Sequence, residues 1–251
     1  MKIGIIIQAR TGSTRLPGKV IEPFVGRQSI LEIIIERILK QFDADQVILA
    51  TTVSGSDDPI EKVGNDFGIH VFRGSEDNVL SRFTGVIRQF NLDGVVRVCA
   101  DNPFLDVDSF HDLIKWGVEN KADYSAFSIS DTVPTIKSHF GLWAEYVSAD
   151  ALLRAEKLTT EKLYQEHVTN FIYGNSDKFA VDLHVLPHNW ALEKNIRFTL
   201  DTEEDFKLLE KMYQDCILHT IKFSPASLIS YVKAHPEIEN EMAIQVQRWE
   251  K

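Results

Sequence analysis

Short apolar runs alternate with longer stretches of helical periodicity along the first half of the chain. Runs rich in β-branched residues predict strands at residues 3–8, 46–52, 70–72, 94–99 and 123–128. Between these runs, apolar residues recur at the three- and four-residue spacing of helices that bury one face. Strands alternating with helices are typical of a mostly parallel sheet that helices cover on both faces. The pattern therefore predicts an α/β fold.

Local signals mark where the predicted helices begin. Ser29 and Glu32 have the spacing of a capping box, in which each side chain bonds the backbone N–H of the other residue. Pro59 stands at a first helical turn, where its missing N–H does no harm. We expect further helices at residues 78–90, 108–120 and 149–157, and a last one that begins at Pro236.

After residue 128 the pattern becomes less regular. We expect an amphipathic stretch at residues 163–173 and further strands at 141–148, 179–186 and 196–200. The polar segment 131–139 is bounded by turn-forming residues and is the expected mobile loop. A chain of 251 residues without an internal repeat, a low-complexity tract or a linker predicts one domain over residues 1–251.

A loop rich in glycine and arginine directly follows the first predicted strand. Residues 8–19 read Gln-Ala-Arg-Thr-Gly-Ser-Thr-Arg-Leu-Pro-Gly-Lys. Glycine lets backbone N–H groups approach an anion, arginine grips two phosphate oxygens at once, and lysine adds a compact charge. The spacing matches neither the Walker loop nor the dinucleotide fingerprint. The loop predicts a polyphosphate site, and an ordinary surface turn is the alternative.

Composition and charge narrow the classes of function. A net charge of −10 argues against a general nucleic-acid binder, whose surface would be basic. No apolar run approaches the roughly 20 residues of a membrane span, and the first strand leaves no room for a signal peptide, so we expect a cytoplasmic protein. Cys99 and Cys216 are too few for a disulfide framework, and we expect both to be structural.

Two predicted strands end in an aspartate. Asp101 follows the strand at 94–99, and Asp201 follows the strand at 196–200. Ligands of open α/β sheets gather at the carboxyl ends of strands, and Mg²⁺ takes one or two carboxylates together with water and substrate phosphates. Either aspartate could instead cap a helix, although Thr202 can serve that purpose after Asp201. The two acids would form an Mg²⁺ site if the fold brings them together.

These motifs together resemble the cytidylyltransferases that activate acidic sugars, above all the spore-coat polysaccharide (SpsF-type) branch. Besides the loop, the resemblance includes residues 74–83, 100–106, 166–169 and 197–205, in order over about residues 1–215. It implies a Rossmann-like nucleotidyltransferase of the nucleotide-diphospho-sugar transferase type, which in this family is frequently a homodimer. The core would span about residues 1–215, and residues 216–251 would form a C-terminal helical extension.

The resemblance also implies roles for individual residues. The residues expected to bind CTP are Gln8, Ala9, Arg10, Thr11, Gly12, Ser13, Arg15, Lys19 and Asp101. The expected catalytic residues are Arg15, Lys19, Asp101 and Asp201, of which the two aspartates would hold Mg²⁺. The acceptor would face Asp77, Asn78, Arg82, Glu166 and His167. The chain departs from the branch mainly on the acceptor side, at Asn78, Ser81, Cys99 and Asn170.

The expected reaction is attack of an acceptor hydroxyl on the α-phosphate of CTP, with loss of pyrophosphate, to make a CMP-linked precursor of a surface glycan. Lys19, Arg15 and Mg²⁺ would stabilise the charge that grows on the leaving oxygens. His167 is either a general base or a helix histidine whose partners satisfy it. The acceptor stays open among an ulosonic acid, another acidic or amino sugar, and a phosphorylated or phosphonate small molecule.

Two other classes of function compete with this prediction. Asp106-Val107-Asp108 can be interpreted as the metal motif of a GT-A glycosyltransferase that uses a nucleotide sugar. A catalytically inactive sensor would bind CTP without consuming it. Stabilisation by CTP with Mg²⁺ would distinguish a cytidylyltransferase from a glycosyltransferase, and release of pyrophosphate would distinguish it from both alternatives.

Overall fold

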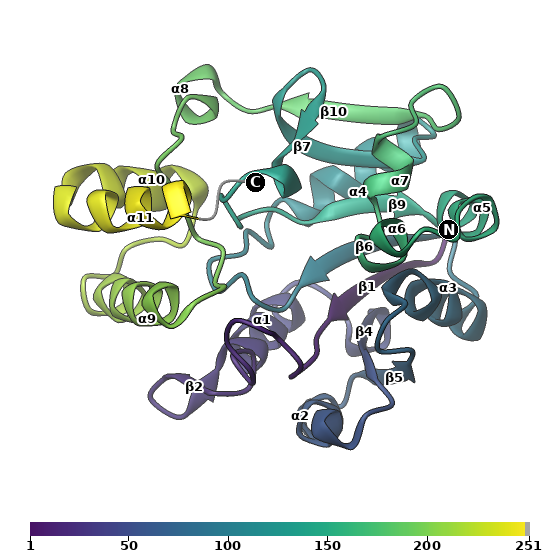
Figure 1. Ribbon diagram of the computed structural model, residues 1–251, viewed down its shortest axis with the longest axis horizontal. Helices are drawn as coiled ribbons and strands as arrows, with labels where there is room; N and C mark the ends of the chain where they lie inside the picture. Colours follow the sequence, from purple (N-terminus) through teal and green to yellow (C-terminus); the bar gives the residue numbers. More distant parts are fainter. Residues whose placement is uncertain (249–251) are drawn as a thin grey trace.

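A mixed eight-stranded sheet lies at the centre of the computed structural model, which describes residues 1–248 (Figure 1). The strands are β1 (Ile3–Gln8), β4 (Val47–Thr52), β5 (His70–Gly74), β6 (Gly94–Cys99), β7 (Tyr124–Ser130), β8 (Val133–Pro134), β9 (Glu145–Ser148) and β10 (Val181–Val185). Their order is β10-β7-β9-β6-β1-β4-β5, with β8 paired to β7. A separate two-stranded sheet joins β2 (Pro23–Val25) to β3 (Gln28–Ser29).

Most neighbouring strands run parallel. β1 pairs in parallel with β4 and β6, β4 with β5, and β10 with β7. β9 is antiparallel to both β6 and β7 and joins the two parallel groups. This arrangement confirms the predicted mostly parallel sheet, and it places the ends of β1 and β6 side by side.

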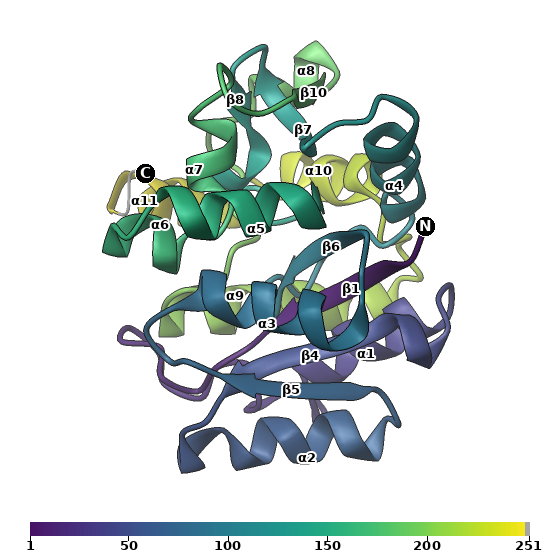
Figure 2. The ribbon, with the colours of Figure 1, turned by 90° about the vertical axis from the view of Figure 1, so that its right-hand side faces the viewer.

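Helices cover both faces of the sheet. They are α1 (Ile30–Leu39), α2 (Asp58–Asp66), α3 (Val79–Phe90), α4 (Phe110–Glu119), α5 (Ala149–Leu158), α6 (Lys162–Glu166), α7 (Asn170–Tyr173), α8 (His188–Ala191), α9 (Glu203–Leu218), α10 (Pro225–Ala234) and α11 (Pro236–Arg248). Alternation along β1 sends Ile5 and Ile7 into one hydrophobic cluster and Ile6 into the other. The first cluster contains residues of α1, α4 and α9, and the second contains residues of α3 and α5, which lie side by side (Figure 2).

The start signals of the helices are confirmed. Ser29 caps α1, and its capping box with Glu32 is complete. Thr202 caps α9 in the same way, with Asp205 as its partner, so the capping role after the predicted 196–200 strand goes to Thr202 and not to Asp201. The boundary that we expected near residue 215 falls inside α9. Leu228 of α10 and Ile238 of α11 belong to the same buried cluster as the strand residues.

Three predictions for the second half of the chain need correction. Residues 196–200 form no strand, because their backbone pairs with loops: the Phe198 N–H donates to the His139 carbonyl (3.0 Å) and the Leu200 N–H to the Asp101 carbonyl (3.3 Å). The segment 131–139 is not a plain loop, since it contains β8 and a 3₁₀ turn at Thr135–Lys137. The amphipathic stretch 163–173 is divided between α6 and α7.

Among residues 1–248, no helix combines the length and the apolar character that crossing a bilayer requires.

Candidate active site

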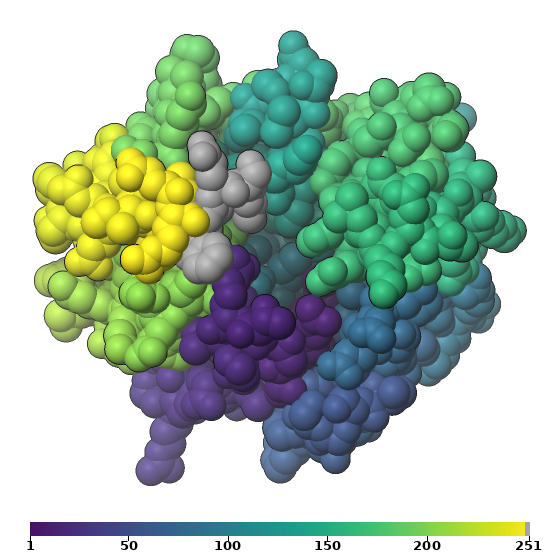
Figure 3. All heavy atoms as spheres, viewed as in Figure 1, coloured from purple at the N-terminus to yellow at the C-terminus, as the bar shows by residue number. Residues whose placement is uncertain are grey.

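Two adjoining cavities open at the carboxyl ends of β1 and β6. Figure 3 shows the surface hollowed between the N-terminal segment, in purple, and the green segment that carries α6. The first cavity, of about 290 Å³, is lined by the loop after β1, and we call it the first chamber. The second chamber, of about 520 Å³, is walled mainly by residues 135–143 and 163–173. Of the residues that the structure describes, six line both chambers: Arg15, Arg97, Cys99, Asp101, His167 and Asp201.

Lys19 lies at the point where the two predicted acids meet. Its ammonium Nζ is 2.8 Å from Oδ2 of Asp101 and 3.4 Å from Oδ1 of Asp201, and it also donates to the Leu200 carbonyl. The lysine is only 6% exposed. Burial acts to lower the pKa of Lys19, but the two carboxylates more than offset it, so the net pKa is raised and the side chain stays charged. Residues 19, 101 and 201 thus converge in space.

Asp201 is held by cations from two further elements. Its carboxylate accepts from Nη2 of Arg15 at 2.7 Å and from Nη2 of Arg197 at 3.1 Å. Arg197 is buried and binds Asp205 through two 2.8 Å bonds, and Asp205 in turn accepts from the backbone N–H of Asp201. This arrangement orients Asp201 toward Lys19. The role of Arg197 was missed by sequence reasoning, although the residue stands four positions before Asp201.

The loop after β1 is anchored by a buried carboxylate. Oδ1 of Asp57 accepts from the backbone N–H of Thr11 (2.8 Å) and from its hydroxyl (2.6 Å), and Oδ2 accepts from the hydroxyls of Thr51 and Thr52. Burial acts to raise the pKa of Asp57, but these hydrogen bonds outweigh it and the net pKa is lowered. Gly18, at φ 75°, makes the turn that lets its N–H reach the Thr11 carbonyl.

Most residues expected to bind the nucleotide do line the first chamber. Gln8, Ala9, Arg10, Ser13, Arg15, Lys19 and Asp101 are among them. Within the described part of the chain, Thr11 and Gly12 line neither chamber. Thr11 instead ties the loop to Asp57. A Cβ on Gly12 would come within 3.2 Å of the Glu76 carboxylate, so this glycine allows the close packing of two loops.

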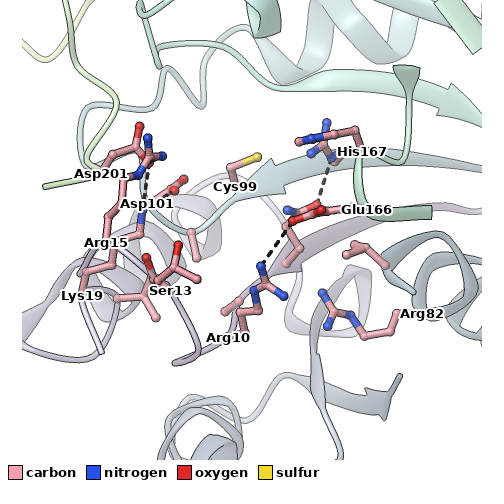
Figure 4. A pocket seen from close by; sticks show the side chains of 17 residues that line it. Arg10, Ser13, Arg15, Lys19, Arg82, Cys99, Asp101, Glu166, His167 and Asp201 are labelled. Atoms are coloured by element: carbon pink, nitrogen blue, oxygen red, sulfur yellow. Dashed lines mark hydrogen bonds and ion pairs between the residues drawn. The ribbon is translucent and has the colours of Figure 1, made fainter. Parts of the chain in front are cut away.

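The residues expected to face the acceptor are divided between different places. Asp77 and Asn78 line neither chamber in the region described, and Asn78 caps α3 by accepting from the Ser81 N–H at 2.9 Å. Arg82 and Glu166 line the first chamber only, and His167 lines both. Figure 4 shows Glu166 reaching Arg10 across the first chamber, at 3.6 Å. Of the residues expected to face the acceptor, only His167 therefore lines the second chamber among those described.

Sequence reasoning missed a buried ion pair, one member of which, Arg97, lines both chambers. Arg97 of β6 and Glu145 of β9 are directly opposite each other in the antiparallel register, and Nη1 of Arg97 is 2.5 Å from the carboxylate. Thr169 bonds both side chains, and Nε of Arg97 donates to Gln8 at 3.0 Å. Replacing a buried ion pair by apolar residues often leaves the free energy of unfolding unchanged or raises it. The presence of this pair is therefore not explained by stability of the fold. Its contact with Gln8 links it to the loop after β1.

Asp101 and Asp201 supply the oxygen ligands available here for a divalent cation. Among residues 1–248, no cluster of three or more histidine, cysteine or acidic side chains is arranged to hold a metal ion. Two carboxylates next to an open chamber suit Mg²⁺, which fills the rest of its shell with water and substrate phosphates. The donor set therefore fits that ion.

The alternative metal motif lies elsewhere. Asp106 and Asp108 line a separate cavity of about 340 Å³ together with Trp116 and Trp190, and neither lines the two chambers. Burial, followed by the neighbouring charge of Asp108, raises the pKa of Asp106 to about 6. Because Asp106 and Asp108 lie away from Lys19, Asp101 and Asp201, they give no support to a glycosyltransferase metal site in the two chambers.

Comparison with known proteins identifies the family. Residues 4–222 match the sequence profile of the family described as cytidylyltransferase. The chain belongs to the cytidylyltransferase family. This cytidylyltransferase is a CTP-dependent nucleotidyltransferase, and the predicted Rossmann-like fold is confirmed.

Relatives resemble the protein along nearly its whole length. It is 37% identical over 240 residues to an uncharacterized protein of Methanocaldococcus jannaschii, with 96% of this chain and 94% of the relative covered. It is 32% identical over 241 residues to the spore coat polysaccharide biosynthesis protein SpsF of Bacillus subtilis, covering 94% and 96%. The structure of a cytidylyltransferase from Leptospira borgpetersenii has a TM-score of 0.82 at 28% identity, covering 95% and 96%. The resemblance predicted from the motifs is thus confirmed.

Proposed function

We propose that this cytidylyltransferase transfers CMP from CTP to an acidic sugar or a related small acceptor, for the synthesis of a surface polysaccharide. One observation carries the proposal: the larger second chamber shares Asp101, Asp201 and Arg15 with the first chamber, which the loop after β1 lines. A transferase needs two substrates to meet at one set of charged groups. The likeness to SpsF, whose name refers to spore coat polysaccharide, supports the glycan context.

The lining of the second chamber suits a hydroxylated, anionic molecule. Its volume of about 520 Å³ is that of a small-molecule pocket. Hydroxyl and amide groups come from Asn102, Thr135, Ser138, Asn170, Tyr173 and Thr199. Trp143 offers an aromatic face, and Lys137 adds a positive charge at the rim. Polar groups of this kind match sugar hydroxyls, and the lysine matches a carboxylate.

Charge development explains the proposed roles in catalysis. The acceptor oxygen forms a bond to the α-phosphorus while the bond to the bridging oxygen breaks, and pyrophosphate leaves with additional negative charge. Lys19 and Arg15 are fixed cations close to where that charge grows. Asp101 and Asp201 would hold Mg²⁺, which supplies a Lewis acid for the phosphate oxygens. His167 lines both chambers, which makes it the candidate to accept the hydroxyl proton.

An extract experiment tests this function. The protein would be incubated with CTP, Mg²⁺ and a small-molecule extract of its own organism, and new CMP conjugates identified by mass. We expect one conjugate and an equal amount of pyrophosphate, and neither with a Lys19→Ala variant. Binding of CTP without either product would favour the inactive sensor. We also propose a cytoplasmic homodimer, which cell fractionation and sedimentation would test.

A further inference from the structure

Arg97 lies where the two chambers meet. It lines both of the chambers that residues 1–248 form, whereas Lys19 lines the first alone. With CTP in the first chamber and the acceptor in the second, as proposed above, the phosphorus atom that is transferred lies where the two substrates meet. Side chains that line both chambers are therefore within reach of that atom. Figure 4 shows Cys99, two positions after Arg97 on β6, between Asp101 and Glu166.

The guanidinium group of Arg97 is held by three other segments. Its Nε donates to Oε1 of Gln8 at 3.0 Å. Its Nη1 donates to Oε2 of Glu145 at 2.5 Å and to the hydroxyl of Thr169 at 3.2 Å. These bonds fix the plane of the guanidinium before a substrate arrives, so its remaining nitrogen needs no reorganisation during a reaction.

This remaining nitrogen is open to a ligand. Within residues 1–248, Nη2 of Arg97 has no hydrogen-bond partner, and unlike Nε of Arg82 it is not fully enclosed. Arg97 is 7% exposed, and the surface that it retains faces the chambers that it lines. Glu145 is 2% exposed and lines neither chamber among the described residues. Most buried donors in proteins are paired, so an open, unpaired donor in a chamber wall points to a ligand.

We propose that Arg97 is a further catalytic residue, whose Nη2 donates to a non-bridging oxygen of the α-phosphate of CTP. In the reaction the acceptor oxygen bonds to the α-phosphorus, and the hydroxyl proton passes to His167 or to water. The bond to the bridging oxygen breaks, and pyrophosphate leaves with the electron pair of that bond. Because charge is spread over the non-bridging oxygens in such a transition state, a donor fixed beside them lowers the barrier. This role accounts for a buried ion pair that stability of the fold does not explain.

Binding of CMP and of cytidine, measured by calorimetry in the same Mg²⁺ buffer, tests this contact without an acceptor. Both would be titrated into the wild type, into Arg97→Lys, and into a double variant that combines Arg97→Met with Glu145→Gln. Lysine keeps the charge but lacks the planar set of donors, and the double variant leaves no unpaired buried charge. In both variants the affinity for CMP should fall about tenfold, while the affinity for cytidine changes less than about twofold. Arg154→Lys is the matched control, because Arg154 also pairs with a carboxylate, that of Asp123, and lines neither chamber in the described structure.

Kinetics with the two diastereomers of CTP α-thiophosphate test the role of Arg97 in the reaction. Sulfur replaces one non-bridging oxygen in each diastereomer and accepts hydrogen bonds weakly, so the wild type should react more slowly when the sulfur faces Nη2. The acceptor would be the one identified from the extract. In Arg97→Lys, kcat with CTP should fall at least about tenfold, and the rates of the two diastereomers should move closer together.

Three results would overturn the inference. An equal loss of CMP and cytidine affinity in both variants would show that Arg97 only supports the shape of the pocket. Unchanged CMP affinity would place Nη2 away from the α-phosphate, and a raised KM for the acceptor would then assign it to that substrate. An unchanged ratio between the two thiophosphate diastereomers would remove Arg97 from the reacting group.

Failure of the proposed function would be distinguishable from failure of this inference. A protein that binds CMP normally but forms no conjugate from the extract would refute the proposed function, and the comparison of CMP with cytidine would still decide the contact of Arg97. If thermal melting shows that Arg97→Lys does not fold, the double variant decides in its place, because its buried groups carry no unpaired charge.

Discussion

The two chambers differ in how they are built. The first is formed largely by one continuous loop after β1, which buried hydrogen bonds to Asp57 hold in place. The second is assembled from separate segments, residues 135–143 and 163–173, which bring hydroxyl and amide groups. The comparison teaches that the first chamber, which we propose for the nucleotide, depends strongly on one contiguous stretch of sequence. The second chamber, which we propose for the acceptor, uses segments outside the sheet, which can vary without disturbing it.

The largest effect should come from the charged cluster formed by Lys19, Asp101 and Asp201. Lys19→Ala and Asp201→Ala should each lower kcat at least about 100-fold, because the first removes a fixed cation from the reacting phosphates and the second removes a carboxylate that would hold Mg²⁺. Pyrophosphate release at saturating CTP measures this effect. Lys115→Ala, at an exposed position of α4, serves as the control. Near-normal turnover in either variant would refute the assignment of the cluster.

The next largest effect should come from Asp57, which anchors the loop after β1, and should be a loss of protein stability. Asp57→Asn should lower the free energy of unfolding by about 2 kcal/mol at pH 7, because an amide group would face the donors of Thr11 or Thr52. The folded-state pKa of Asp57 is lowered, so its contribution is complete above the unfolded pKa and is lost as the pH falls below about 4. Urea unfolding of both proteins at several pH values measures the difference. A gap between them that stays constant down to pH 3 would contradict this account.

Changing Arg197, which holds Asp201 in place, should have a smaller effect on catalysis. Arg197→Lys keeps the charge but loses the two-bond contact with Asp205, so Asp201 would be less well oriented. We expect kcat to fall by about tenfold, in line with losses of groups that position metal ligands, while KM for CTP stays nearly constant. A change in KM alone would place Arg197 in nucleotide binding instead.

The smallest effect should come from the rim of the second chamber. Lys137 is exposed and takes part in no ion pair within the described residues. Lys137→Ala should raise KM for an anionic acceptor by about threefold, as exposed charge pairs contribute little, and leave KM for CTP unchanged. Steady-state kinetics with the acceptor identified from the extract would measure both constants. An equal rise in both would remove the distinction between the chambers.

Sequence patterns predicted the parts of the site that depend on neighbouring residues. The strand at 3–8, the capping box of Ser29 and the loop after β1 are local features, and the structure has them where they were expected. The strand expected at 196–200 was wrong, since propensity does not reveal whether a partner strand lies alongside. Asp77 and Asn78 were placed with the acceptor by resemblance, yet neither lines a chamber among the residues described.

The sequence by itself determined the fold class, the family and the cationic loop, because periodicity and contiguous motifs are properties of neighbouring positions. Only the tertiary structure decided that Asp101 and Asp201 share the Lys19 ammonium, that Arg97 pairs with Glu145, and that Arg82 lies at the far end of the first chamber. These contacts join residues far apart in the chain. Their existence depends on strand order and loop packing, which no local pattern encodes.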